Sequence, residues 1–131
     1  MKNALLSVYH KIGIVKFAKA LVELDFTIYA SGGTFKHLTE NGVIALPVSD
    51  LVGGEAILGH RVVTLSRQIH AGLLAKNTEE DIAELARLAI PRLDLVCVDL
   101  YPLEAEIAKT GSTRESVVEQ TDIGGPTMIR S

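Results

Sequence analysis

Hydroxyl side chains flank two glycines in the stretch Ser31–Thr34, where an apolar run gives way to polar residues. The run before it, Phe26–Ala30, is rich in strand-forming residues and predicts a strand. The run after it, Phe35–Asn41, predicts a short helix capped by Thr34 and ended by Gly42. Glycines let backbone N–H groups approach an anion, and a helix N-terminus favours negative charge. The stretch therefore predicts a site for a phosphorylated metabolite, with a tight turn that binds nothing as an equally open alternative.

Two further polar segments close predicted strands. Residues 7–11 end the strand expected at Ala4–Val8, and residues 99–102 end the strand expected at Asp94–Leu100. In open parallel sheets, ligands collect beyond the carboxyl ends of the strands. We therefore expect both segments at the same edge of the sheet as Ser31–Thr34.

Five side chains in and beyond these segments carry useful chemistry. Lys11 could supply a positive charge to a phosphate, Arg61 a two-pronged contact to phosphate or carboxylate, and Thr64 a hydroxyl donor. Tyr101 could present a phenol as a proton donor, and Asp122 could face a pocket with its carboxylate. The ordinary alternatives are surface positions for the first three, a half-buried ring for Tyr101 and a helix N-cap for Asp122.

Composition excludes several classes of function. The chain has 131 residues, 47% of them apolar, and a net charge of −3, which fits one folded domain and argues against a nucleic-acid surface. The four histidines lack metal-ligand spacing, and no phosphate-loop lysine, dinucleotide fingerprint or nucleophile elbow is present. The single cysteine, Cys97, lies in an apolar run and predicts an inert buried thiol. With no signal peptide and no membrane-spanning stretch, the sequence indicates a cytoplasmic protein without membrane partners.

The order of elements predicts an α/β fold. A strand at Ala4–Val8, an amphipathic helix beginning at Ile14 and a strand at Phe26–Ala30 form a βαβ unit, which favours a parallel sheet. A third strand is expected at Val43–Val48, near an edge because of Pro47. The nearly continuous apolar run Asp94–Leu100 is expected in the middle of the sheet. We expect a single three-layer domain with a central, mostly parallel sheet flanked by helices.

The remaining chain is predicted to be irregular or helical. Ser49–Gly72 is interpreted as a long ordered loop with short elements, including a strand-like stretch at Arg61–Leu65. Three more helices are expected: one over Thr78–Ala89 capped by Thr78, one from a Ser112 and Glu115 capping box to Gln120, and one beginning near Pro126. Because the chain stops soon after Pro126, we expect a domain over residues 1–131 that is truncated at its C-terminus.

Five segments taken together resemble the inosine monophosphate cyclohydrolase domain of the bifunctional purine biosynthesis family. They are ALLSVYHKIGIVKFAKAL, ASGGTFKHL, GHRVVTLSRQIHAGLLA, DLVCVDLYPLE and DIGGPTMIRS, in the family's order across essentially the whole chain. In that family the domain is paired with an aminoimidazole carboxamide ribonucleotide transformylase. The resemblance implies a methylglyoxal-synthase-like fold, no cofactor and no metal. It also implies ring closure of formyl-aminoimidazole carboxamide ribonucleotide, giving inosine monophosphate and water.

The resemblance also implies roles for particular residues. The phosphate and ribose would lie against Ser7, Lys11, Ser31, Gly32, Gly33, Thr34, Arg61 and Thr64, and the base against Asp122, Ile123 and Gly124. Tyr101, Asp122 and Lys11 are the catalytic candidates. The partner would be a small-molecule purine ribonucleotide, and a homodimer remains an open alternative to the monomer.

Several positions depart from the family's motifs. The pattern S-V-S-D-K is present as Ser7-Val8-Tyr9-His10-Lys11, and the Asn of N-L-Y-P is Asp99. Val63 stands where the family places a lysine associated with catalysis, and the family's A-A-A-K-N-H segment does not follow Arg130. Losing two cations from an oxyanion site could cost several kcal/mol of transition-state stabilisation. The roles of Arg67 and His70 are left open.

These departures favour one alternative function. The domain could be a phosphate- or nucleotide-binding regulatory module without turnover, as in the related terminal domain of carbamoyl phosphate synthetase. A methylglyoxal-synthase-like lyase is a lower alternative, because the segments after Ser31–Thr34 resemble the purine family much more.

Overall fold

The computed structural model describes residues 2–131, and a four-stranded parallel sheet lies at its centre. The strands are β1 (Lys2–Ser7), β2 (Phe26–Ala30), β3 (Leu46–Pro47) and β4 (Leu95–Val98), in the order β3-β2-β1-β4. The register pairs Leu6 of β1 with Ala30 of β2 and with Cys97 of β4, so three strands end at the same level. The α/β class and the βαβ unit expected from the sequence are confirmed.

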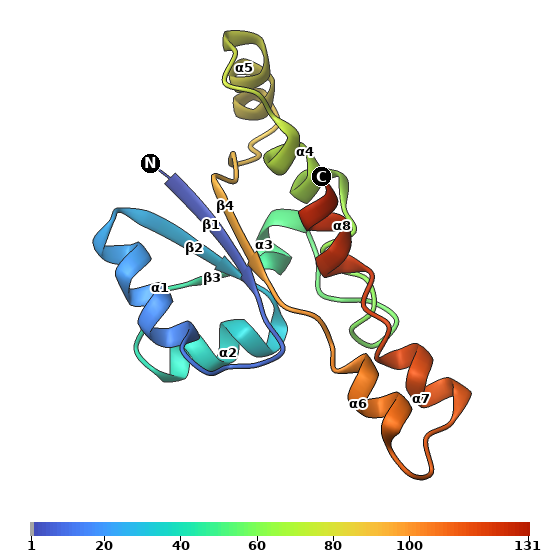
Figure 1. Ribbon diagram of the computed structural model, residues 1–131. Helices are drawn as coiled ribbons and strands as arrows, with labels where there is room; N and C mark the ends of the chain where they lie inside the picture. The colour runs from blue at the N-terminus through green and yellow to red at the C-terminus, as the bar shows by residue number, and fades with distance from the viewer. Residues whose placement is uncertain (1) are drawn as a thin grey trace.

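Helices cover both faces of the sheet (Figure 1). On one face lie α1 (Ile14–Glu23) and α2 (Gly32–Glu40), and on the other lie α3 (Val48–Val52), α4 (Arg67–Leu74) and α8 (Gly124–Arg130). Successive residues of β1 point to opposite faces, so Leu6 packs with α1 and α2 while Leu5 packs with α3, α4 and α8. The result is the predicted three-layer domain with two cores, one on each side of the sheet.

Three helices stand away from the sheet. Figure 1 shows α5 (Glu79–Arg87) at one end of the molecule, and α6 (Leu103–Ala108) beside α7 (Arg114–Glu119) at the other. Only Leu85 of α5 is buried, and no residue of α6 or α7 is. The expected Thr78 cap of α5 is confirmed, because its side chain accepts a hydrogen bond from the Asp81 N–H at 3.3 Å.

The apolar strand near Cys97 is at the edge of the sheet, which corrects the expectation that it lies in the middle. Among residues 2–131, β4 pairs only with β1, and each of its four residues is half-buried. Its residues are apolar because alternate side chains join the two cores, Cys97 on the α1 and α2 side and Val98 on the α8 side. Burial on two faces thus explains the apolar run without a second neighbouring strand.

The expected cap of α2 is also corrected. The helix begins one turn earlier, with Ser31 as N-cap, and Thr34 lies inside the first turn and is buried. The sequence predicts a later helix start because two glycines precede Thr34 and glycine has poor helix propensity. The hydrogen bonds of the buried Thr34 side chain to Val8 outweigh that propensity. Gly42 adopts φ 74° after the helix, which confirms it as the stop signal.

Other boundaries differ from those expected. The third strand was expected over Val43–Val48, but β3 has only two residues. It lies at the edge of the sheet, as the position of Pro47 predicted. The strand-like stretch Arg61–Leu65 contributes only a single bridge between Val62 and Ile57. Thr113, rather than Ser112, caps α7, in a capping box with Ser116. Helices α3 and α4 are the short elements expected within residues 49–72.

No helix within residues 2–131 has the length and apolar character needed to cross a membrane.

Replacing Leu38 by alanine tests the core beneath α2. Leu38 is fully buried between α2 and the sheet, so Leu38→Ala should lower the free energy of unfolding by about 2–5 kcal/mol. Ile44→Ala is the matched control, because Ile44 is 84% exposed and should change stability little. Urea denaturation measures both, and equal losses would contradict the described packing.

Candidate functional site

A cavity of about 670 Å³ opens at the carboxyl ends of the strands. Its walls come from the β1–α1 loop, the start of α2, residues 47–64, the end of β4 and the α7–α8 connection. Every site residue singled out from the sequence lines it: Ser7, Lys11, Ser31, Gly32, Gly33, Thr34, Arg61, Thr64, Tyr101, Asp122, Ile123 and Gly124. The structure brings these residues together, while their individual roles stay predictions.

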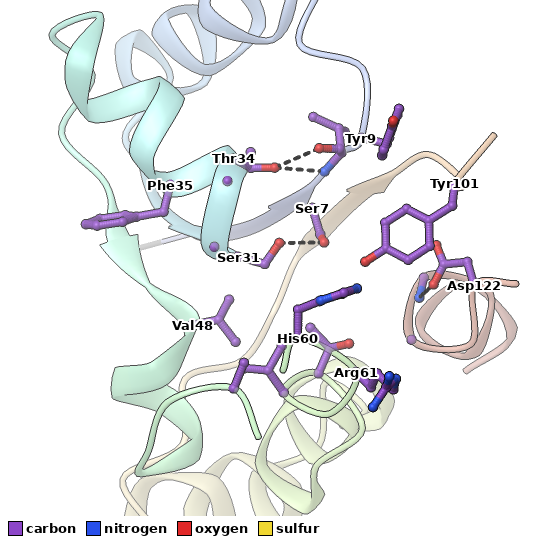
Figure 2. A pocket seen from close by; sticks show the side chains of 18 of the residues that line it. Ser7, Tyr9, Ser31, Thr34, Phe35, Val48, His60, Arg61, Tyr101 and Asp122 are labelled. Atoms are coloured by element: carbon purple, nitrogen blue, oxygen red, sulfur yellow. Dashed lines mark hydrogen bonds between the residues drawn. The ribbon is translucent and has the colours of Figure 1, made fainter. Parts of the chain in front are cut away.

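Hydroxyl groups tie the β1–α1 loop to the start of α2, as Figure 2 shows. The Oγ atoms of Ser7 and Ser31 are 2.6 Å apart. Thr34 Oγ1 accepts from the Val8 N–H and donates to the Val8 carbonyl oxygen, both at 3.0 Å. Since its only proton is engaged, Thr34 holds the loop in place. The N–H groups at the start of α2, Lys11 and one hydroxyl proton of the Ser7 and Ser31 pair are the donors that face this corner.

The ammonium of Lys11 lies above the start of α2. Its Nζ donates to the carbonyl oxygens of Val8 and Tyr9, the latter at 2.9 Å. A Cβ placed on Gly33 would lie 4.0 Å from this Nζ, so the cation and the glycine backbone face the same space. Burial lowers the pKa of Lys11, and the nearby Asp99 carboxylate partly offsets that effect.

Tyr101 and Asp122 form the opposite wall (Figure 2). The ring of Tyr101 packs edge-on against Tyr9, with centroids 5.8 Å apart, and against His60 at 6.4 Å. Burial raises the pKa of Tyr101, and the Asp122 and Glu119 carboxylates raise it further. Its phenol is therefore protonated at neutral pH and available as a donor.

Asp122 is held at the entrance to α8. Its Oδ1 accepts from the Gly125 N–H at 3.3 Å. A Cβ on Gly125 would lie 2.9 Å from Asp122 Oδ2, and one on Gly124 would lie 2.5 Å from Thr64 Oγ1. Both positions therefore need glycine, because a side chain would displace the groups that line the cavity.

Arg61 reaches the cavity wall, yet its guanidinium is already paired. Its Nε and one terminal nitrogen both donate to Glu119 Oε1, the former at 2.9 Å, and its other terminal nitrogen donates to the Leu58 carbonyl oxygen at 3.2 Å. These bonds lower the pKa of Glu119, so the pair is ionic at neutral pH. An anion that binds Arg61 must therefore compete with Glu119.

Among the polar side chains of the lining, His60 and Glu119 were not expected from the sequence, whereas Tyr9 and Asp99 belong to segments expected at this edge but were given no site role. Tyr9, His60, Asp99 and Glu119 all line the cavity. The position of Asp99 at a strand end was a usable signal, whereas no spacing rule points to His60 or Glu119. Among residues 2–131, no group of three or more histidine, cysteine, aspartate or glutamate side chains is arranged to hold a metal ion.

The single cysteine is outside the cavity lining. Cys97 lies half-buried on β4, and burial, with a smaller effect of Asp99, raises the pKa of its thiol. The thiolate is therefore disfavoured, as expected for a structural cysteine.

Comparison with known proteins identifies relatives. Residues 13–127 match the family model described as the MGS-like domain. A bifunctional purine biosynthesis protein PurH from Caldicellulosiruptor bescii is 48% identical over 131 residues, 99% of this chain and 26% of that protein. PurH of Macrococcus caseolyticus is 47% identical, over 100% of this chain and 27% of that protein. The chain thus spans about a quarter of these relatives.

A solved structure has the same fold. The crystal structure of ForH superposes with a TM-score of 0.80 at 35% sequence identity, covering 98% of this chain and 66% of that one.

Releasing Arg61 should strengthen anion binding. Glu119→Gln removes the charge that competes for the guanidinium, so affinity for inorganic phosphate should rise several-fold. Glu55→Gln is the control, because Glu55 lines the same cavity but makes no ion pair among the described residues. Calorimetric titration measures both variants, and an equal gain in the two would show that overall charge, rather than Arg61, decides affinity.

Proposed function

This chain belongs to the MGS-like domain family, and from that premise we propose that it is the inosine monophosphate cyclohydrolase part of a purine biosynthesis protein. Support comes from relatives named as bifunctional purine biosynthesis proteins, 44–48% identical across essentially the whole chain. Because the chain spans about a quarter of their length, the specific activity is a proposal, which the family resemblance suggests and the residues lining the cavity support.

The cavity suits a ribonucleotide in size and polarity. A volume of about 670 Å³ lies within the usual range for small-molecule sites. The phosphate of formyl-aminoimidazole carboxamide ribonucleotide is assigned to the corner with Lys11 and the start of α2. Its base is then assigned to the wall with Tyr101, Asp122 and Ile123.

The proposed reaction needs little more than positioning and proton transfer. The carboxamide nitrogen attacks the formyl carbon, the ring closes, and the former formyl oxygen leaves as water. Holding the two groups in an attacking pose removes much of the entropic barrier. In our assignment, the neutral Tyr101 phenol donates a proton to the developing oxyanion, and the Asp122 carboxylate accepts the proton from the attacking nitrogen. The Asp122 carboxyl group then gives that proton to the departing hydroxyl, the carbon–oxygen bond breaks, and the formamide N–H proton returns to the Tyr101 phenolate. Water leaves, and both side chains regain their starting protonation states.

One observation carries this assignment. The phenol of Tyr101 and the carboxylate of Asp122 lie on one wall of the cavity. Lys11 and the glycines of α2 lie on the opposite wall of the same cavity. A proton donor and a proton acceptor thus face the same space as a phosphate corner, as the reaction requires.

A second candidate function is nucleotide binding without turnover. Val63 lines the cavity where the resemblance places a lysine, and an apolar side chain cannot stabilise an oxyanion. Of the two permanent cations in the lining, Arg61 is paired with Glu119, which leaves Lys11 as the main positive group. Such a site would bind a purine monophosphate and leave the formylated substrate unchanged.

Turnover of the formylated ribonucleotide separates the two functions. The wild-type chain should form inosine monophosphate, and Tyr101→Phe should lower kcat about 100-fold while calorimetric binding of inosine monophosphate changes little. Tyr29→Phe, on β2 and outside the cavity lining, serves as the control. Tight binding by the wild type with no product at high enzyme concentration would refute the cyclohydrolase assignment in favour of the binding module.

A further inference from the structure

Two departures from the family motifs, 89 residues apart in sequence, contact each other beside the cavity, which Asp99 lines and His10 does not. His10 replaces the Asp of S-V-S-D-K, and Asp99 replaces the Asn of N-L-Y-P. In the structure, His10 Nδ1 lies 3.0 Å from Asp99 Oδ2. The two changes therefore form one interaction between the β1–α1 loop and the end of β4.

Asp99 also binds the backbone of that loop. Its Oδ1 accepts from the Tyr9 N–H, and its Oδ2 accepts from the His10 N–H at 2.9 Å. Together with the imidazole, these donors use both carboxylate oxygens. Burial tends to raise the pKa of Asp99, but the hydrogen bonds from His10 and Tyr9 outweigh it and leave the pKa below its ordinary value. The carboxylate is therefore charged at neutral pH.

The loop held by Asp99 is the loop that carries Lys11. On its other side Thr34 binds Val8, so the segment is fixed between α2 and β4. Lys11 folds back onto the carbonyl oxygens of Val8 and Tyr9 within the same segment. The position of its ammonium over Gly33 thus depends on the backbone path between these two attachments.

We propose that Asp99 and His10 are positioning residues, and that their contact holds the Lys11 loop so that its ammonium meets a phosphate monoester at the start of α2. This inference rests on the proposed function for the phosphate corner and adds residues that the resemblance does not supply. Neither residue acts on the reacting atoms. Both act through the Tyr9 and His10 backbone and through Lys11.

The chain offers a matched control at the opposite end of the same two strands. Asp94 Oδ2 accepts from the Asn3 N–H at 2.9 Å, so a carboxylate next to β4 again binds backbone of β1. The side chains are similarly exposed, 27% for Asp94 and 32% for Asp99. Asp94 is outside the cavity lining, so its loss tests the structural effect alone.

The first experiment measures the contact without a ligand. Amide hydrogen exchange of Tyr9 and His10 should become at least severalfold faster in Asp99→Asn, because an amide side chain offers one acceptor oxygen in place of two. Asp94→Asn should leave these two amides unchanged. Unchanged exchange in Asp99→Asn would overturn the proposal, whatever reaction the domain catalyses.

The second experiment measures the consequence for phosphate binding. Calorimetry with inosine monophosphate should show affinity falling about tenfold in Asp99→Asn and staying within about twofold of wild type in Asp94→Asn. Equal losses in the two variants, or none in Asp99→Asn, would refute the positioning role. Because calorimetry measures binding and not turnover, this test of the positioning role is valid even if the wild-type chain does not close the ring.

Moving the carboxylate from position 99 to position 10 tests whether phosphate binding can be rescued. His10→Asp alone places two carboxylates at the site of the present 3.0 Å contact, so the loop should be displaced and affinity for inosine monophosphate lost. Adding Asp99→Asn to His10→Asp restores a donor facing an acceptor, and affinity should recover to at least that of Asp99→Asn alone. Failure of the double variant to recover, with its fold intact by circular dichroism, would show that the pair does not act as a unit.

Discussion

Everything at the cavity depends on the parallel pairing of β1 with β2 on one side and with β4 on the other. The register aligns the ends of these strands, so the segments that follow them emerge at one edge of the sheet. Thr34 and Asp99 therefore come within hydrogen-bonding reach of the β1–α1 loop, although they lie far apart in the chain. The pairing is fixed by burial of β1 on both faces, with Leu5 and Leu6 fully inside opposite cores.

The β1–α1 loop acquires its shape from groups outside it. Thr34 satisfies the N–H and carbonyl of Val8, and Asp99 satisfies the N–H groups of Tyr9 and His10. These two side chains thus supply hydrogen-bond partners that regular secondary structure would otherwise provide. The loop that carries Lys11 is thus attached to α2 on one side and to the end of β4 on the other.

Charge in the cavity is distributed unevenly. Carboxylates outnumber permanent cations in its lining, with Asp50, Glu55, Asp99, Glu119 and Asp122 against Lys11 and Arg61. We therefore assign the proposed phosphate site to the corner where Lys11 and the N-terminal end of α2 coincide. At the opposite wall, burial raises the pKa of the Tyr101 phenol, and the Asp122 and Glu119 carboxylates raise it further. The groups proposed for anion binding and those proposed for proton transfer thus lie on opposite walls of the cavity.

The sequence by itself determined the parallel α/β class and the cavity edge, because strand and helix patterns are local and polar residues follow the strands. The family resemblance supplied further members of the predicted site, such as Ile123 and Gly124. Tertiary structure alone decided that β4 is an edge strand, that Ser31 rather than Thr34 caps α2, and that Arg61 is paired with Glu119. It also decided that His10 and Asp99 meet. These features depend on contacts between segments distant along the chain, which local propensity does not encode.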